Sequence, residues 1–374
     1  MKIGILTLPL HTNYGGILQA YALQTVLEYM GHDVKVLSRD RMYHLTPFYW
    51  LVIIPSRLFR RLIGKKIGLF NEVRFNRAQS KIKVNVEPII EQYIHRDKRK
   101  LAEICEKDYD CYIVGSDQIW RPKYIKDTLK STVGNAFLEF TKNWNVKRIA
   151  YAASFGTDEW EYSPDQTKTI FSLAQGFKAI SVREKSGVEL CMGHLGVKAE
   201  QVLDPTMLLQ KEVYIRAFNI ENEPKSKGTL MTYILDYTEE KRVLVEHIAK
   251  DKGLDPFTVG AKIDDRNAPI AERIQPRLQK WLRGFYDAEF VVTDSFHACV
   301  FSILFGKPFI VIGNVERGLS RFDSLLALFG LEKNLISNIE HYNSKFDYTI
   351  PADAYVKLES YRLKSKQYLL DNLS

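Results

Sequence analysis

The sequence lacks the features that mark membrane-spanning, secreted and metal-binding proteins. Its 374 residues contain only four cysteines, which show no metal-ligand spacing and which we interpret as reduced thiols. No run approaches the roughly 20 consecutive apolar residues that a membrane-spanning helix needs. The first ten residues, MKIGILTLPL, have neither the basic start nor the small-residue cleavage site of a signal peptide. These absences predict a cytoplasmic protein without a metal site.

The motifs of two further ligand classes are also missing. The formal charge of +8 is spread along the chain, and no zinc-finger, homeodomain or aromatic ribonucleoprotein motif accompanies it, so we expect no nucleic-acid partner. The turn at residues 11–16 follows a strand but lacks the Gly-x-Gly-x-x-Gly spacing of a dinucleotide site, so we expect no cofactor. The excess of basic over acidic residues favours anionic substrates or an anionic membrane surface.

The chain does contain short apolar strands that alternate with helices. This alternation predicts a parallel sheet covered by helices on both faces. Because 374 residues exceed what one hydrophobic core usually holds, and because residues 210–228 are polar and precede a second series of strands, we expect two domains. The predicted fold is therefore α/β, with two Rossmann-like domains, residues 1–209 and 210–353, facing a cleft. Amphipathic residues 354–374 form a last helix that crosses back over the first domain.

Residues 289–313 carry the chemistry of the second domain. They read as a strand, a polar turn, a helix and a second strand. Ser295 is placed to cap the helix that begins at Phe296, and Gly306 to end it, so His297 falls in the first turn of the helix. Backbone N–H groups and the helix dipole suit an anion at this position, which indicates a phosphate or carboxylate ligand.

Two turns of the first domain also follow predicted strands. The two glycines of the first turn let the backbone approach a ligand, although a tight strand-to-helix turn explains them as well. The second turn offers a sugar hydrogen-bond partners and a stacking ring, although a tryptophan buried at a domain interface is the alternative. The candidate acceptor-binding residues are Asn13, Tyr14, Gly15, Gly16, Asp117, Gln118 and Trp120.

Residues 47–70, PFYWLVIIPSRLFRRLIGKKIGLF, break the α/β pattern as a basic and apolar insertion. The segment is too short to cross a bilayer, but aromatic residues at headgroup depth and basic residues on anionic lipid are typical of a segment that lies on one. The alternative is an internal helical hairpin whose apolar face packs on the domain. The sequence leaves both interpretations open.

Five motifs in order give the chain a resemblance to a known family. They are Asn13-Tyr14-Gly15-Gly16, residues 114–120, residues 181–184, Leu203-Asp204-Pro205 and residues 294–297. Together they resemble the polysaccharide pyruvyl transferase family, over most of the chain. The resemblance implies a fold like that of the GT-B glycosyltransferases, with phosphoenolpyruvate as donor and transfer of the pyruvyl group to a sugar as a cyclic ketal. It also implies a role in making capsules, exopolysaccharides or cell-wall polymers, with acceptors that include lipid-linked, polyprenyl-type sugars.

The resemblance also assigns roles to individual residues of this sequence that match the motifs of the family by position. The histidine of the family at the second-domain helix matches His297, and its arginine after a first-domain strand matches Arg183. A basic residue about twenty positions beyond the histidine matches Arg317, with Arg321 close behind. Better-known members carry an arginine where this chain has Ser295. The resemblance thus implies that the first domain binds the acceptor and the second the phosphoenolpyruvate.

The chemistry of the donor dictates the roles of these residues. Phosphoenolpyruvate brings a phosphate and a carboxylate, which arginine binds bidentately. The candidate donor-binding residues are Arg183, Ser295, His297, Arg317 and Arg321. His297 can also move a proton, and the helix start should lower its pKa and favour a neutral imidazole. Asp117 and Asp294 are candidates for activating acceptor hydroxyls, which completes the catalytic set; no metal is needed.

Two other functions fit the same sequence. A metal-independent GT-B glycosyltransferase that uses a nucleotide sugar has the same architecture, because the fold does not select the donor. A non-catalytic carbohydrate-binding or assembly protein is compatible with Ser295 in place of the expected arginine.

Overall fold

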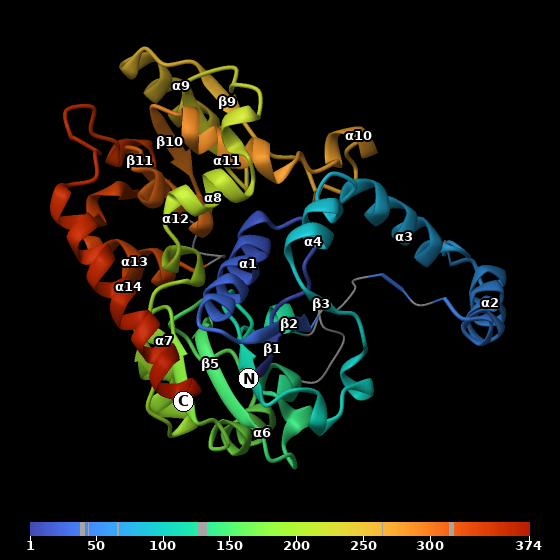
Figure 1. Cartoon of the computed structure of the whole chain (residues 1–374). Helices are drawn as coiled ribbons and strands as arrows, with labels where there is room; N and C mark the ends of the chain where they lie inside the picture. Colours follow the sequence, from blue (N-terminus) through green and yellow to red (C-terminus); the bar gives the residue numbers. More distant parts are fainter. Residues whose placement is uncertain (38–41, 44, 66, 126–132, 264, 314–317) are drawn as a thin grey trace.

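The computed structural model describes residues 1–37, 42–43, 45–65, 67–125, 133–263, 265–313 and 318–374. Two α/β domains follow one another along the chain, each built on a parallel sheet, as the sequence predicts (Figure 1). Short apolar strands connected by helices force this arrangement, because each strand must bury both faces.

The first domain contains a seven-stranded sheet in the order β3-β2-β1-β4-β5-β6-β7, with every described pairing parallel. Its central strand, Cys111–Val114, is fully buried, and its side chains belong to the two core clusters on opposite faces of the sheet. The strands are β1 (Lys2–Leu6), β2 (Asp33–Leu37), β3 (Arg96–Asp97), β4 (Cys111–Val114), β5 (Lys147–Ala153), β6 (Ala179–Val182) and β7 (Glu200–Gln201).

The second domain contains a five-stranded parallel sheet in the order β12-β11-β10-β8-β9. Its strands are β8 (Leu230–Tyr233), β9 (Pro256–Thr258), β10 (Phe290–Thr293), β11 (Phe309–Ile312) and β12 (Leu335–Ile336).

Helices connect these strands, with short 3-10 turns between some of them. The helices of the first domain are α1 (Tyr14–Tyr29), α2 (Pro47–Leu62), α3 (Asn71–Ile82), α4 (Glu87–Tyr93), α5 (Pro122–Tyr124), α6 (Pro164–Ala174) and α7 (Lys185–Leu190). Those that follow are α8 (Lys211–Ala217), α9 (Glu239–Lys252), α10 (Ile270–Arg273), α11 (Leu278–Asp287), α12 (Phe296–Phe305), α13 (Ser320–Phe329) and α14 (Ala352–Leu373).

The β10–α12–β11 unit has the boundaries that its sequence predicts. α12 begins after Ser295 and ends at Gly306, and all ten of its residues are buried. One detail differs from the prediction: Ser295 occupies the N-cap position in an extended conformation, but its side chain makes no capping hydrogen bond. The backbone N–H of Ser295 instead donates to Thr293 Oγ1 at 3.0 Å. The apolar composition of α12 is explained by this complete burial.

The last helix, α14, lies along the first domain although it follows the second (Figure 1). The Tyr368 hydroxyl donates to the carbonyl of Ala150 at 3.1 Å, and the Leu203 N–H donates to Ser365 Oγ at 3.0 Å. These contacts join α14 to β5 and to the segment after β7. The helix therefore links the two domains a second time, in addition to the chain segment that connects β7 to β8.

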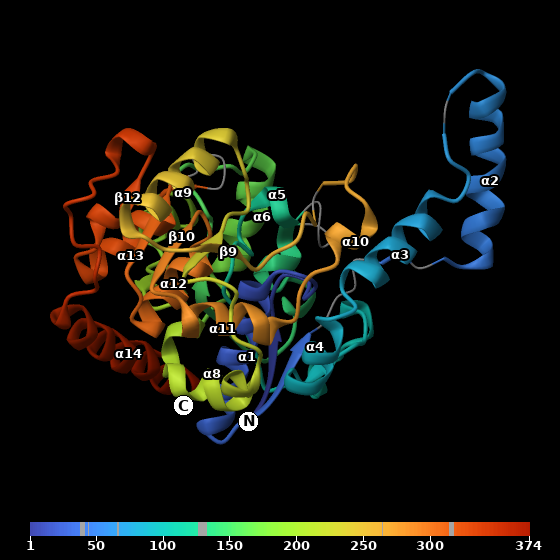
Figure 2. The ribbon, with the colours of Figure 1, turned by 90° about the horizontal axis from the view of Figure 1, so that it is seen from above.

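Helix α2 projects away from both domains (Figure 2). It folds against its own return segment, but the large apolar side chains on its outer side are exposed, among them Leu51 and Leu62 at 73% and 84%. The hypothesis of an internal hairpin whose apolar face packs on the domain is therefore wrong. No helix in the described part of the chain is long and apolar enough to cross a membrane.

The docking of α14 predicts different outcomes for two neighbouring leucines. Leu369 is fully buried in the core, whereas Leu370 is 48% exposed. We expect Leu369→Ala to lower the free energy of unfolding by about 3 kcal/mol, because it leaves a cavity. Leu370→Ala should change it by less than about 0.5 kcal/mol. Urea unfolding measures both, and equal effects would show that α14 is not docked.

Candidate functional site

Five side chains from both domains converge where strands of the two sheets end. Asp117 follows β4, Arg183 follows β6 and Asp204 lies just after β7. His297 lies in the first turn of α12, and Arg321 lies in the first turn of α13. Since ligands of open α/β sheets bind at the carboxyl ends of the strands, this cluster is the candidate site.

Asp204 lies at the centre of the cluster and is 2% exposed. Its Oδ2 accepts hydrogen bonds from Ser116 Oγ and from Arg183 Nη1, both at 2.9 Å. Its Oδ1 accepts from the N–H and the hydroxyl of Thr206, at 3.0 and 2.7 Å. Burial alone raises the pKa of Asp204, but the charge of His297 when it is protonated, the charge of Arg183 and the Thr206 hydrogen bonds outweigh it, so the pKa lies below its usual value. Asp204 is therefore a buried carboxylate.

Two nitrogens of Arg183 have no hydrogen-bond partner among the described residues. Besides the hydrogen bond to Asp204, its Nη2 lies 3.7 Å from Asp117 Oδ1 and its Nε lies 3.7 Å from Glu184 Oε2. Neither atom makes a hydrogen bond within the described residues, and the side chain is 1% exposed. Buried N–H groups are normally hydrogen-bonded, so this pair points to a ligand.

The ring of Phe296 supports both arginines of the cluster. The guanidinium carbon of Arg183 lies 4.3 Å from the ring centroid, and that of Arg321 lies 5.5 Å from it. Burial, followed by the positive charge of Arg183, lowers the pKa of Arg321 to about 10, so Arg321 remains charged at neutral pH. The aromatic face partly offsets the cost of holding two cations together.

His297 connects the second domain to this cluster. Its Nε2 lies 3.7 Å from Asp204 Oδ2 and makes no hydrogen bond within the described part of the chain. Burial lowers its pKa below 6.5 against the opposing charges of Asp204 and Asp117. As the sequence predicts, His297 is therefore a neutral imidazole at neutral pH, and one of its nitrogens faces the buried carboxylate.

Asp117 adopts a strained backbone conformation at the edge of the cluster. Its φ of 66° lies in the left-handed region, which a non-glycine residue adopts only when its surroundings enforce it. The Gln118 N–H donates to its Oδ1 at 2.9 Å, and Asn13 Nδ2 lies 3.5 Å from its Oδ2. The strained turn points the carboxylate toward Arg183.

Glu184, the residue after Arg183, is fully buried. Its Oε1 accepts hydrogen bonds from the Ser154 hydroxyl and from the N–H groups of Phe155 and Gly156, at 2.8, 2.9 and 3.2 Å. Its Oε2 makes no hydrogen bond within the described residues. Glu184 therefore fixes the loop after β5 and leaves one oxygen toward Arg183.

The domains touch at two glycines near the site. A Cβ atom on Gly15, at the start of α1, would lie 2.0 Å from Nδ1 of His297. Gly318 has a φ of +88°, and a Cβ atom there would lie 1.8 Å from the carbonyl oxygen of Gly156 in the other domain. Only glycine allows these backbones to approach so closely, so the cluster is closed between the domains.

Two predicted acceptor-binding residues are part of the core. Trp120 is fully buried and stacks on Phe137 with ring centroids 4.7 Å apart, and its indole N–H donates to the Ala136 carbonyl. Tyr14 is also fully buried and donates its hydroxyl to the Pro276 carbonyl at 2.6 Å, which ties the two domains together. Neither ring is exposed to a sugar in this structure, and the acceptor-binding roles of the two residues remain predictions.

The remaining predicted residues lie at different distances from the cluster. Asn13 is exposed and caps α1 through the Gly16 N–H, so both remain accessible on the first-domain side. The side-chain oxygen of Gln118 accepts from Arg121 at 3.3 Å and lies against Gly156. Arg317 lies outside the described residues.

Asp294 does not join the cluster. Its carboxylate accepts hydrogen bonds from the N–H groups of Leu235 and Asp236, at 2.6 and 3.1 Å, and from Lys241 Nζ at 2.6 Å. Because these donors engage both oxygens, Asp294 anchors the loop after β8. The catalytic role predicted for Asp294 is not supported by these contacts.

The sequence reasoning assigned no role to Asp204, Glu184 and Phe296. All three belong to motifs that follow predicted strands. Glu184 and Phe296 are adjacent to predicted site residues, and Asp204 is followed by a proline. For Asp204 and Glu184, the signal in the sequence is a carboxylate directly after a predicted buried strand. Such a group must be paired, but its partner is not visible in one sequence.

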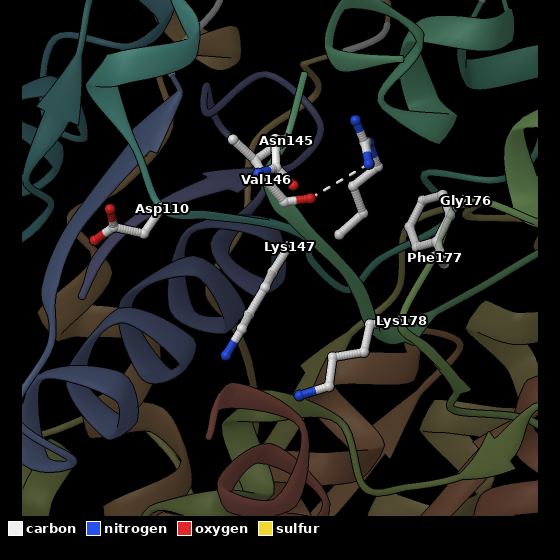
Figure 3. Close-up of a pocket in the computed structure, with 8 residues that line it drawn as sticks. Asp110, Asn145, Val146, Lys147, Gly176, Phe177 and Lys178 are labelled. Atoms are coloured by element: carbon white, nitrogen blue, oxygen red, sulfur yellow. Dashed lines mark hydrogen bonds between the residues drawn. The ribbon is translucent and has the colours of Figure 1, made fainter. Parts of the chain in front are cut away.

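A surface hollow elsewhere on the molecule, of about 530 Å³, is shown in Figure 3. Asp110, Lys147 and Lys178 are among the residues that line it, at the opposite ends of the strands from the cluster. Nζ atoms of both lysines donate to the Ser374 carbonyl oxygen, at 2.6 and 2.9 Å. These lysines therefore hold the end of α14, and we do not assign the hollow to the active site.

Gly15 and Gly16 offer a matched test of the contact between the domains. We expect Gly15→Ala to lower the free energy of unfolding by about 1–3 kcal/mol, because the added Cβ overlaps His297. Gly16→Ala should change it by less than about 1 kcal/mol, because the nearest atom is 3.4 Å away. Thermal unfolding compares the two, and a stable Gly15→Ala variant would show that His297 does not pack there.

The lowered pKa of His297 predicts a pH dependence of stability. Below 6.5 the unfolded chain binds a proton that the folded protein resists, so stability falls as the pH decreases through this region. The loss should be at most about 1.4 kcal/mol per pH unit and absent in His297→Asn. Urea unfolding at several pH values measures the difference, and parallel curves for the parent and His297→Asn would mean that folding does not lower the pKa of His297.

Comparison with known proteins identifies a family and a fold for this chain. The polysaccharide pyruvyl transferase family model matches residues 13–316. A search of curated proteins finds no matching sequence. Among solved structures, Anabaena HepE in complex with UDP and glucose is 10% identical, with a TM-score of 0.52 over 100% of this chain and 99% of that one.

A second structure shows the same fold. The UDP-GlcNAc 2-epimerase from Neisseria meningitidis, bound to UDP-GlcNAc, is 10% identical, with a TM-score of 0.50 over 100% of this chain and 99% of that one. At this identity the likeness shows the fold alone, which is of the GT-B type. The family match covers most of the chain and includes every member of the cluster except Arg321. The chain belongs to the polysaccharide pyruvyl transferase family.

Proposed function

We propose that this protein transfers the pyruvyl group of phosphoenolpyruvate to a sugar as a cyclic ketal, with release of phosphate. The single observation that carries the proposal is the buried Arg183, whose Nε and Nη2 have no hydrogen-bond partner within the described residues, beside the neutral His297. An anionic ligand with several oxygens supplies the missing acceptors.

The donor requires two cationic contacts, one for its phosphate and one for its carboxylate. Arg183 and Arg321 supply two guanidinium groups on the same aromatic ring, and a guanidinium binds either anion bidentately. Arg321 also offers a buried positive charge in a site where Ser295 replaces the arginine of better-known family members. The departure at Ser295 is thus compatible with binding the donor.

The proposed reaction balances as an addition followed by a displacement. A proton adds to the methylene carbon of phosphoenolpyruvate, which becomes a methyl group and leaves the neighbouring carbon electron-poor. One sugar hydroxyl forms a bond to that carbon and loses its proton. A second hydroxyl then bonds to the same carbon as the carbon–oxygen bond to phosphate breaks. Of the two hydroxyl protons released, one replaces the proton used and one leaves with phosphate.

The residues of the cluster divide these tasks. His297 is neutral before binding, so it can accept a proton from the phosphate or from a hydroxyl. Asp117, at the exit of β4, is the carboxylate of the first domain that can accept the proton of an acceptor hydroxyl. Asp204, with both oxygens engaged, keeps Arg183 and the neighbouring His297 in position.

The acceptor in this proposal is a lipid-linked sugar used to assemble a capsule, exopolysaccharide or cell-wall polymer. It binds on the first-domain side, where Asn13 and Gly16 remain accessible. Such an acceptor would place the protein in the cytoplasm at the inner face of the membrane. Family membership supports the sugar acceptor, and the lipid link is part of our proposal.

Ligand access in this proposal requires the domains to separate. His297 and Arg183 have side-chain exposures of 8% and 1%, and the Gly156–Gly318 contact closes the space between the domains. Domain opening followed by closure excludes water from the reacting groups and strengthens the charge interactions.

Thermal unfolding against a ligand panel tests the donor. Phosphoenolpyruvate at about a hundred times its dissociation constant should stabilise the protein by about 2.7 kcal/mol, and more than phosphate or pyruvate does. Arg321→Gln should remove most of this shift, because one guanidinium is lost from the site. Arg242→Gln, on the exposed surface of α9, should leave it unchanged.

The same panel separates the competing functions. A nucleotide-sugar glycosyltransferase shares the fold, and it would be stabilised by UDP or ADP sugars and not by phosphoenolpyruvate. A non-catalytic carbohydrate-binding protein would respond to neither donor. Either result would contradict pyruvyl transfer.

A further inference from the structure

The segment of residues 47–70, with α2 and its return, forms an arm that lies apart from both sheets (Figure 2). We call it the arm; Lys66 within it lies outside the described residues. The preceding residue, Thr46, caps α2: its hydroxyl accepts from the Tyr49 N–H at 3.2 Å, and Pro47 lies in the first turn. The arm thus starts as a capped helix and not as an irregular loop.

The inner side of α2 packs against the return segment of the arm and the start of α3. Arg57 pairs with Glu72 and donates to the carbonyl of Leu69 at 2.7 Å, while the Trp50 and Phe70 rings lie 5.5 Å apart. The hydrogen bonds from Arg57 lower the pKa of Glu72 to about 2, so this ion pair persists at physiological pH. These contacts fix which side of the helix faces outward.

The outer side of α2 is a continuous apolar face. Its residues recur at intervals of three and four, so together they cover a sector about 120° wide on one side of the helix. Six of them have exposures between 46% and 84%. The face consists of Phe48, Leu51, Val52, Pro55, Leu58, Phe59 and Leu62.

The charge of the arm identifies what covers this face. Residues 47–70 contain five basic residues and no acidic one. Arg60, Arg61 and Lys65 are exposed, and their long side chains can reach past the apolar face to a negatively charged surface. An apolar face flanked by cations is typical of a helix that lies in the headgroup region of an anionic bilayer.

A second copy of the chain fits the face less well. A two-fold dimer through α2 would bring two identical cationic segments together, and no acidic residue of the arm could neutralise them. The nearest carboxylate on the inner side, Glu72, is already paired with Arg57. Repulsion therefore disfavours this dimer, whereas anionic lipid satisfies both the apolar face and the charges.

We propose that the arm docks this protein on an anionic lipid bilayer, with α2 lying in the plane of the membrane surface. At 16 residues α2 is about 24 Å long, and it would insert its apolar face roughly 5–10 Å deep. Docking follows from the arm alone. That it brings the site to a lipid-linked acceptor rests on the proposed function.

Sedimentation with vesicles tests the docking without measuring catalysis. The full chain should sediment with vesicles of phosphatidylcholine mixed with phosphatidylglycerol, and much less with phosphatidylcholine alone. Leu51→Glu combined with Leu62→Glu should weaken binding at least about tenfold, because each change puts a charge into the apolar face. Arg60→Gln combined with Lys65→Gln should weaken binding to the anionic vesicles and reduce its dependence on salt.

Leu363→Glu is the matched control. Leu363 is 69% exposed on α14, far from the arm, so its substitution should leave vesicle binding unchanged. Far-ultraviolet circular dichroism verifies that each variant is folded. Failure of the parent protein to bind anionic vesicles would overturn the proposal. So would a solution dimer that Leu51→Glu and Leu62→Glu convert to a monomer, because the face would then belong to a second copy.

Discussion

The site depends on how one buried carboxylate, Asp204, is paired. A carboxylate at 2% exposure keeps its charge only where donors replace water. Four hydrogen bonds do so, and they come from Ser116, Arg183 and Thr206. Because these donors follow different strands, the carboxylate fixes the strand ends of the first sheet relative to one another. His297 lies 3.7 Å from the same carboxylate and extends this order into the second domain.

Burial also determines what the site can do. Exclusion of water lowers the pKa values of His297 and Arg321, and it strengthens the interaction of every remaining charge with a bound anion. In the proposed function, this burial requires the domains to move apart before a ligand can reach the site. The close contacts between the domains, at Gly15 and at Gly318, would then have to open for a ligand to enter.

The site and the arm depart from ordinary protein architecture in opposite ways. The site buries charged groups, whereas the arm exposes a large apolar face, and both arrangements cost free energy in an isolated chain. Each arrangement becomes favourable when a ligand or a surface of complementary charge and polarity binds to it. In our two proposals, an anion completes the hydrogen bonds of Arg183, and a lipid surface covers Leu51 and Leu62.

The sequence by itself determined the two α/β domains and the start of α12, because strand length, helix periodicity and Gly306 are local signals. It also placed Asp117, Arg183 and His297 at strand ends, where side chains from distant segments meet. It could not determine which polar residues are neutralised or which aromatic rings are buried. The pairing of Asp204 with Arg183, the loss of Asp294 to Lys241 and the burial of Trp120 arise only when distant segments pack together. The outward orientation of the apolar face of α2 was likewise decided by tertiary structure, because the Arg57–Glu72 pair selects the side that turns inward.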